Sequence, residues 1–97
     1  MRREDFVFCI GFEGSTAIVD GRLLRRHGSA STRALAEAGL FKQAINSAVF
    51  SGSAEELAEV LAAYNARIPV PLATTDDLKR TFGVVAVPEG VKKVTIV

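Results

Sequence analysis

Asp5-Phe6-Val7-Phe8-Cys9-Ile10-Gly11-Phe12, at residues 5–12, is the stretch from which the fold class follows. Its larger side chains fall at every second position, namely Phe6, Phe8, Ile10 and Phe12. A period of two is typical of a β-strand, and apolar residues on both faces are typical of a strand inside a sheet. The sequence therefore predicts a central strand over residues 5–12, with a helix packed closely against its face of smaller residues.

A second strand follows this one after a short turn. Glu13-Gly14-Ser15 is a turn signal, and Thr16–Val19 is again rich in β-forming residues. Asp20-Gly21 is a common hairpin turn. Residues 22–26 then fit either a third strand or one turn of helix, and so short a segment does not decide between them.

Residues 28–52 have helical character. The small polar residues at 28–31 offer an N-cap for a helix over residues 32–38. Gly39 interrupts this helix, and a second helix is predicted over residues 40–50.

Two further helices are predicted after residue 52. Ser53 and Glu56 have the spacing of a capping box, and apolar residues at helical spacing follow. This pattern predicts a helix over residues 54–66. A shorter helix through Asp76 to Phe82 is predicted, capped by Thr74 or Thr75 and stopped by Gly83.

The order of these elements is strands, then helices, then a closing strand over residues 92–97. It predicts an α+β fold in a single domain over residues 1–97. The N-terminal hairpin strands and the C-terminal strand would form a small sheet, with three to four helices from the middle packed on one side. An apolar edge strand pairs readily with another chain. The C-terminal strand is therefore the expected element of a homodimer.

The composition indicates a globular protein from a reducing compartment. The chain has 97 residues, of which 48% are hydrophobic, and a formal net charge of +1. Cys9 is the single cysteine, so the chain cannot form an internal disulfide, and a cytoplasmic location is expected. No apolar run approaches the roughly 20 residues of a membrane span, so no membrane association is predicted.

Catalytic and metal-binding patterns are not evident in the sequence. His27 is the single histidine, and no cysteine or carboxylate stands near it at the spacing of a metal site. No set of nucleophile, base and oxyanion donor can be assembled. The sequence predicts no enzymatic activity, no cofactor and no metal.

The functional hypothesis comes from the predicted helix over residues 40–50, which has an apolar and a polar face. The polar face carries Lys42, Gln43, Asn46 and Ser47. A lysine suits contact with phosphate, and amides suit bidentate reading of base edges in the major groove.

Residues 34–52 read Ala-Leu-Ala-Glu-Ala-Gly-Leu-Phe-Lys-Gln-Ala-Ile-Asn-Ser-Ala-Val-Phe-Ser-Gly. This stretch resembles the helix-turn-helix of Cro-type phage repressors, with Gly39 as the turn glycine and Leu40 as the aliphatic residue after it. The resemblance implies that Ile45 and Ala48 are buried in a recognition helix. It also implies that five residues face the major groove or the DNA backbone, namely Phe41, Lys42, Gln43, Asn46 and Ser47. The sequence departs from the pattern at Leu35, where such motifs usually have a small residue.

Three arginines outside this motif would add phosphate contacts, namely Arg22, Arg25 and Arg26. The resulting hypothesis is a small, non-enzymatic, homodimeric regulator that binds double-stranded DNA. The alternative is a protein-interaction or scaffolding domain with no nucleic-acid role, whose contact surface is a sheet edge or an exposed helical stripe. The placement of the polar residues of the 40–50 helix separates the two hypotheses. Exposure would favour DNA, and packing against the protein body would favour the alternative.

Overall fold

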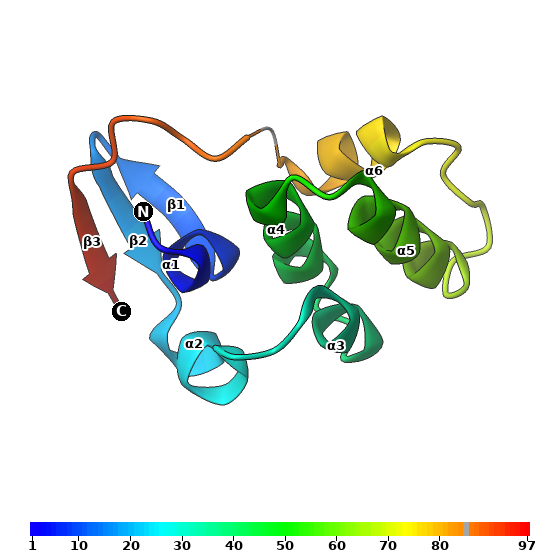
Figure 1. The fold of residues 1–97 in the computed structure, drawn as a ribbon, viewed down its shortest axis with the longest axis horizontal. Coiled ribbons are helices and arrows are strands. Elements are labelled where there is room, and N and C mark those ends of the chain that lie inside the picture. The colour runs from blue at the N-terminus through cyan, green and yellow to red at the C-terminus, as the bar shows by residue number, and fades with distance from the viewer. Residues whose placement is uncertain (85) are drawn as a thin grey trace.

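The computed structural model describes residues 1–84 and 86–97 and has an α+β fold (Figure 1). In chain order the elements are α1 (Arg3–Val7), β1 (Cys9–Glu13), β2 (Thr16–Val19), α2 (Gly21–His27), α3 (Thr32–Glu37), α4 (Phe41–Ser51), α5 (Ala54–Asn65), α6 (Thr75–Phe82) and β3 (Lys93–Ile96). The predicted fold class is confirmed. The described residues contain six helices, more than the sequence predicts, because α1 and α2 are also helical.

The N-terminal segment differs from the prediction of one strand over residues 5–12. Arg3–Val7 is a short helix, and β1 begins only at Cys9. The prediction is wrong for residues 5–8, where α1 ends and Phe8 is its C-cap, because a short apolar run fits a buried helix as well as a strand. Two acidic residues in the first turn of α1 favour the helix through its dipole.

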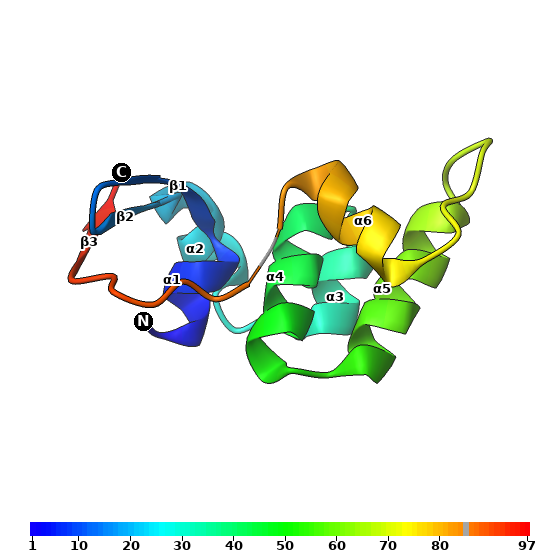
Figure 2. The ribbon, with the colours of Figure 1, turned by 90° about the horizontal axis from the view of Figure 1, so that it is seen from above.

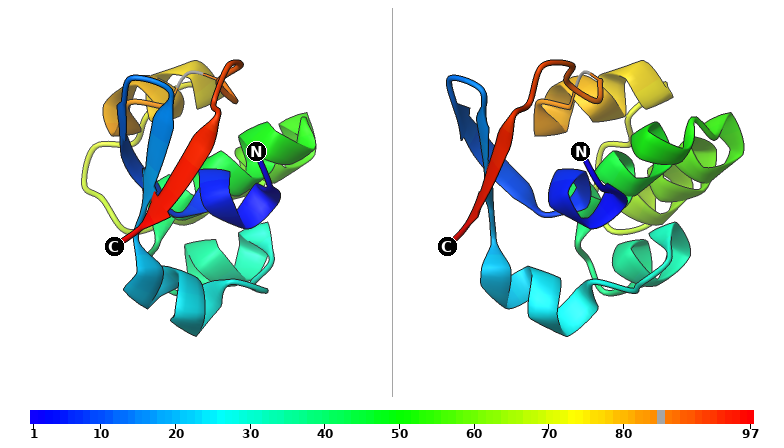
Figure 3. Two further views of the ribbon diagram at one scale, coloured as in Figure 1. Left: turned by 90° about the vertical axis from the view of Figure 1, so that its left-hand side faces the viewer. Right: turned by 60° about the vertical axis from the view of Figure 1, so that its left-hand side comes forward.

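The sheet is mixed and has the strand order β1-β2-β3 (Figure 3). β1 and β2 form an antiparallel hairpin, while β3 pairs with β2 in parallel. The predicted composition of the sheet is therefore confirmed. The central strand is β2, however, and β1 and β3 are its two edges.

Asp20 does not form a hairpin turn but caps the N-terminus of α2. Its carboxylate Oδ1 accepts hydrogen bonds from the backbone N–H groups of Arg22 and Leu23, at 3.0 and 3.1 Å. This is the usual role of aspartate at the residue before a helix. The open alternative for residues 22–26 is thereby decided in favour of a helix.

The end of β3 packs against the first residue of α2. The Gly21 N–H donates a hydrogen bond to the Val97 carbonyl oxygen, with an N···O distance of 2.9 Å. A Cβ at Gly21 would lie 2.7 Å from both the Ile96 Cγ2 atom and the Val97 oxygen. The absence of a side chain at Gly21 therefore permits the close approach of α2 and β3.

The predicted helices of the middle segment are present. The Gly39 backbone lies in the left-handed region, with φ of +79°, and joins α3 to α4. Ser53 caps α5 by accepting from the Glu56 N–H at 3.1 Å, as its spacing predicts. Thr74 caps α6 in the same way. In the described part of the chain, no helix combines the length and apolar character that crossing a membrane requires.

The helices α3 to α6 pack together on one side of the sheet, and α1 and α2 lie between them and the strands (Figure 1 and Figure 2). One core cluster connects these parts. Its buried residues are Val7, Phe8, Val19, Leu35, Ala36, Ala44, Ile45, Val60, Leu78 and Val84. Since the cluster includes residues of α1, β2 and the helices α3 to α6, it holds α4 against α1 and connects both to the sheet.

Candidate functional site

Asn46, which was expected to read base edges, is buried against α1. It is only 4% exposed. Its side-chain Nδ2 donates to the carbonyl oxygens of Phe6 and Val7, at 3.3 and 3.1 Å. The last carbonyls of a helix have no partner within the helix and need donors from elsewhere. Asn46 therefore caps the C-terminus of α1.

Ser47 is buried beside it and joins three helices. It is 3% exposed. Its Oγ lies 2.7 Å from the Thr32 Oγ1 of α3 and accepts a hydrogen bond from the Arg3 Nη2 of α1 at 2.8 Å. The same Arg3 Nη2 donates to the Ala30 carbonyl oxygen at 2.7 Å. We call Arg3, Thr32, Asn46 and Ser47 the α1 clasp.

The α1 clasp shows that Asn46 and Ser47 are not on the exposed face of α4 that the DNA-binding hypothesis requires. The Asn46 amide nitrogen is hydrogen-bonded to carbonyl oxygens of α1, and the Ser47 hydroxyl is hydrogen-bonded to Arg3 and Thr32. In this fold these groups therefore do not reach a base edge. The physical reason is that α1 covers this face of α4, which the sequence did not reveal because residues 5–7 were predicted as a strand.

Phe41, which was also expected to face DNA, is half-buried in an aromatic cluster. Its ring packs edge-on against Tyr64 with centroids 5.2 Å apart, and Tyr64 packs edge-on against Phe82 at 5.4 Å. The Arg67 guanidinium lies 5.4 Å from the Phe41 ring centroid, within cation–π range. Phe41 therefore connects α4 to α5 and α6.

The remaining predicted residues lie on two separate elements. Arg22, Arg25 and Arg26 are exposed on α2, and none of them forms an ion pair with a described residue. Lys42 and Gln43 are half-buried on α4. Figure 1 shows α2 and α4 at different places in the fold. The structure thus does not gather the predicted residues into one continuous face.

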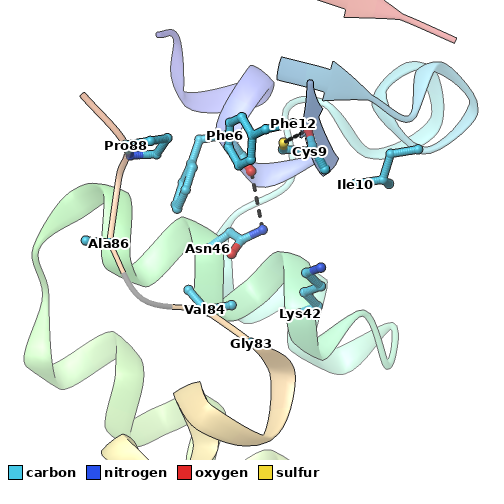
Figure 4. Close-up of a pocket in the computed structure, with 11 residues that line it drawn as sticks. Phe6, Cys9, Ile10, Phe12, Lys42, Asn46, Gly83, Val84, Ala86 and Pro88 are labelled. Atoms are coloured by element: carbon cyan, nitrogen blue, oxygen red, sulfur yellow. Dashed lines mark hydrogen bonds between the residues drawn. The ribbon is translucent and has the colours of Figure 1, made fainter. Parts of the chain in front are cut away.

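An open cavity of about 310 Å³ lies between β1, α4 and the segment after α6 (Figure 4). A volume of this size is at the lower end of the range for small-ligand pockets. The cavity, which we call the β1 groove, is lined by residues that include Ile10, Phe12, Lys42, Asn46, Val84, Ala86 and Pro88. In the view of Figure 4, Ile10 and Lys42 lie at one end and Ala86 and Pro88 at the other.

The walls of the β1 groove are apolar apart from a few groups. Ile10 and Phe12 are 54% and 48% exposed, although they are large hydrophobic residues. Lys42 supplies a cation from α4. Cys9 is buried at the base of β1, and its thiol lies within hydrogen-bonding distance of the Gly11 carbonyl oxygen, at 3.2 Å. This arrangement can hold an apolar ligand with a negative group.

Sequence reasoning missed the β1 groove. Ile10 and Phe12 were assigned to a core face, and the alternation of large residues gives no sign that this end of the strand stays uncovered. An indirect signal is Gly83, which ends α6, together with Ala86 and Pro88 after it, because residues of these types do not continue a helix well.

Among the residues that the structure describes, no three side chains of the metal-binding types cluster together. No protein-family model, no curated protein and no solved structure matches this chain. The likeness of residues 34–52 to a repressor motif therefore stays a prediction.

Proposed function

We propose that this protein is a non-enzymatic protein-interaction domain and that the β1 groove is its contact surface. The observation that carries the proposal is the exposure of Ile10 and Phe12 in the wall of an open cavity. Large apolar side chains that gather at a concave surface are typical of sites that bind a partner or ligand. Aromatic side chains are also among the residues that contribute most to binding energy at interfaces.

The α4 helix supports the same choice. A recognition helix must present its polar side chains to solvent before it meets DNA. Two of the four polar residues predicted for that role are held in the α1 clasp. The formal net charge of +1 also provides little general attraction for a polyanion.

Replacing Phe12 with serine is expected to weaken partner binding by roughly thirtyfold or more, which is the effect of losing one interface hot spot. The probe is a phage-displayed library of random peptides, selected on the immobilised protein. Enriched peptides are then synthesised, and their dissociation constants are measured by isothermal titration calorimetry. The side chain of Phe12 is partly exposed, so the variant should keep its fold, which circular dichroism checks.

Val70→Ser is the matched control, because Val70 is 76% exposed and lies outside the groove. It should bind the selected peptides as the unchanged protein does. If no peptide is enriched, or if the Phe12→Ser protein binds the enriched peptides equally well, the proposal is wrong.

A second candidate function is binding to the backbone of double-stranded DNA. The observation that favours it is the exposure of Arg22, Arg25 and Arg26 on one short helix, without ion pairs to described residues. Such arginines suit phosphate contact without sequence readout. Two copies that pair through the outer edge of β3 would double the number of arginines in contact with one DNA duplex. Ile96 of β3 is exposed at this strand.

Under this second function, changing both Arg25 and Arg26 to alanine should weaken DNA binding and flatten its dependence on salt. Each lost phosphate contact lowers the slope of log affinity against log salt by about one. Fluorescence anisotropy with a labelled DNA duplex measures both quantities. Arg80→Ala is the control, because Arg80 already pairs with Asp77. If the unchanged protein does not bind any duplex at low salt, this function is excluded.

A further inference from the structure

The outer edge of β1 borders the β1 groove. β1 is the first strand in the order β1-β2-β3, so its other side pairs with no described strand. Cys9, Ile10, Gly11 and Phe12 all line the cavity, and they are consecutive residues. Alternate residues of a strand point to opposite faces. The cavity therefore extends along four consecutive residues of this outer strand.

This edge is short and has one irregularity in its pairing with β2, two features that limit pairing with another chain, but it has no other shield of the usual kind. Natural edge strands are often shielded by lysine, proline or a covering segment. β1 has the sequence Cys-Ile-Gly-Phe-Glu and contains neither lysine nor proline. The irregularity in its pairing with β2, between Cys9 and Gly11, leaves the Ile10 side chain exposed. An added strand would thus meet the outer edge of β1 next to apolar side chains.

Lys42 gives the groove a charge preference. It lines the cavity from α4, is half-buried, and forms no ion pair with any described residue. A cation that is partly removed from water is better compensated by a nearby anion than left alone. The groove therefore complements a partner that is apolar and carries a carboxylate.

We propose that the occupant of the β1 groove is an extended peptide segment that adds to β1 as a further strand and places an acidic side chain against Lys42. This inference rests on the proposed interaction function and specifies its partner. Main-chain hydrogen bonds to the β1 edge would provide affinity, and alternate side chains would enter the apolar walls at Ile10 and Phe12. The acidic residue would set the register of the added strand.

The experiment uses the peptides enriched from the random library. Acidic residues are expected to recur at one position of the enriched sequences. Lys42→Met should weaken binding of such a peptide by about tenfold, which is typical of removing one partner of a close charge pair. The same variant should bind the Asp→Asn or Glu→Gln analogue of the peptide as tightly as the unchanged protein does. Lys92→Met, an exposed lysine outside the groove, is the control.

Strand addition is tested with two further analogues of one peptide. Each is N-methylated at alternate backbone amides, and the two differ in which alternate set is blocked. The analogue blocked on the amides that face β1 should lose binding, while the other should keep it. Equal binding of both analogues would overturn strand addition in favour of side-chain contacts alone.

The results separate this inference from the function on which it rests. Absence of any enriched peptide contradicts the interaction function itself. Enriched peptides that depend on Phe12 but contain no recurrent acid, or that bind the Lys42→Met protein unchanged, contradict only the acidic partner.

Discussion

Replacing Leu35 with alanine is expected to lower the free energy of unfolding by about 2–5 kcal/mol, the range for deleting a large aliphatic side chain from a core. Leu35 is fully buried on α3 and belongs to the same core cluster as Ile45 of α4 and Val60 of α5. The shortened side chain would leave a cavity where these three helices meet. A close-packed interior closes such a cavity only in part.

Urea denaturation followed by far-UV circular dichroism measures this change. Val70→Ala is the control, because Val70 is largely exposed, and its effect should stay within about 0.5 kcal/mol. Equal midpoints for the two variants would show that α3 does not pack on α4 and α5 as described.

Leu35 also matters for the resemblance to a helix-turn-helix. A bulky residue at this position was the departure from the repressor pattern, and the structure shows how the chain accommodates it. Leu35 is buried in the core while α3 and α4 remain in contact and Gly39 makes the turn. The bulky side chain is therefore part of what joins the helices.

Replacing Asn46 with alanine is expected to lower the free energy of unfolding by about 1–3 kcal/mol. The loss follows because the buried Val7 carbonyl oxygen would lose the Asn46 donor, and the Phe6 carbonyl oxygen would keep only its backbone N–H donor. Asn46→Asp should be at least as damaging. It keeps the size of the side chain but removes the N–H groups and sets a carboxylate against two carbonyl oxygens near the negative end of the α1 dipole.

Gln43→Ala is the matched control for Asn46→Ala. Both remove an amide from α4, and both change the helix propensity in the same direction. The Gln43 side chain forms no hydrogen bond with a described residue, so its loss should change stability by less than about 0.5 kcal/mol. Chemical denaturation of the two variants gives the comparison. If both lose the same stability, Asn46 does not hold α1 in place.

The sequence predicted the elements whose signals are local. Ser53 and the residues after it give both the start and the buried stripe of α5, and Thr74 gives the start of α6. Caps and periodicity depend on neighbours within a few residues, so they can be recognised without knowledge of the tertiary fold. The fold class followed from the order of these elements.

The errors arose where tertiary contacts decide the structure. Residues 6–8 are apolar without a helical period, and the packing of α1 against α4 favours a helix over a strand at this end of the segment. The order of the strands was also beyond local signals, because β3 joins β2 and not β1.

The candidate site was predicted only in part for the same reason. A polar residue on a helix can face solvent or satisfy a buried group, and Asn46 and Ser47 do the latter. Lys42 was identified as a binding residue, but its apolar surroundings in the β1 groove depend on the distant segment after α6.

The parallel pairing of β3 with β2 has a consequence for the order of folding. The β1–β2 hairpin and the helices form through contacts that are near in sequence, whereas Thr16 pairs with Lys93 across most of the chain. Distant pairings form slowly, because the entropy lost in closing a long loop precedes their stabilising contacts. One edge of β2 therefore stays unpaired until β3 pairs with it and packs against Gly21. A nascent chain on the ribosome would pass through this stage each time the protein is made.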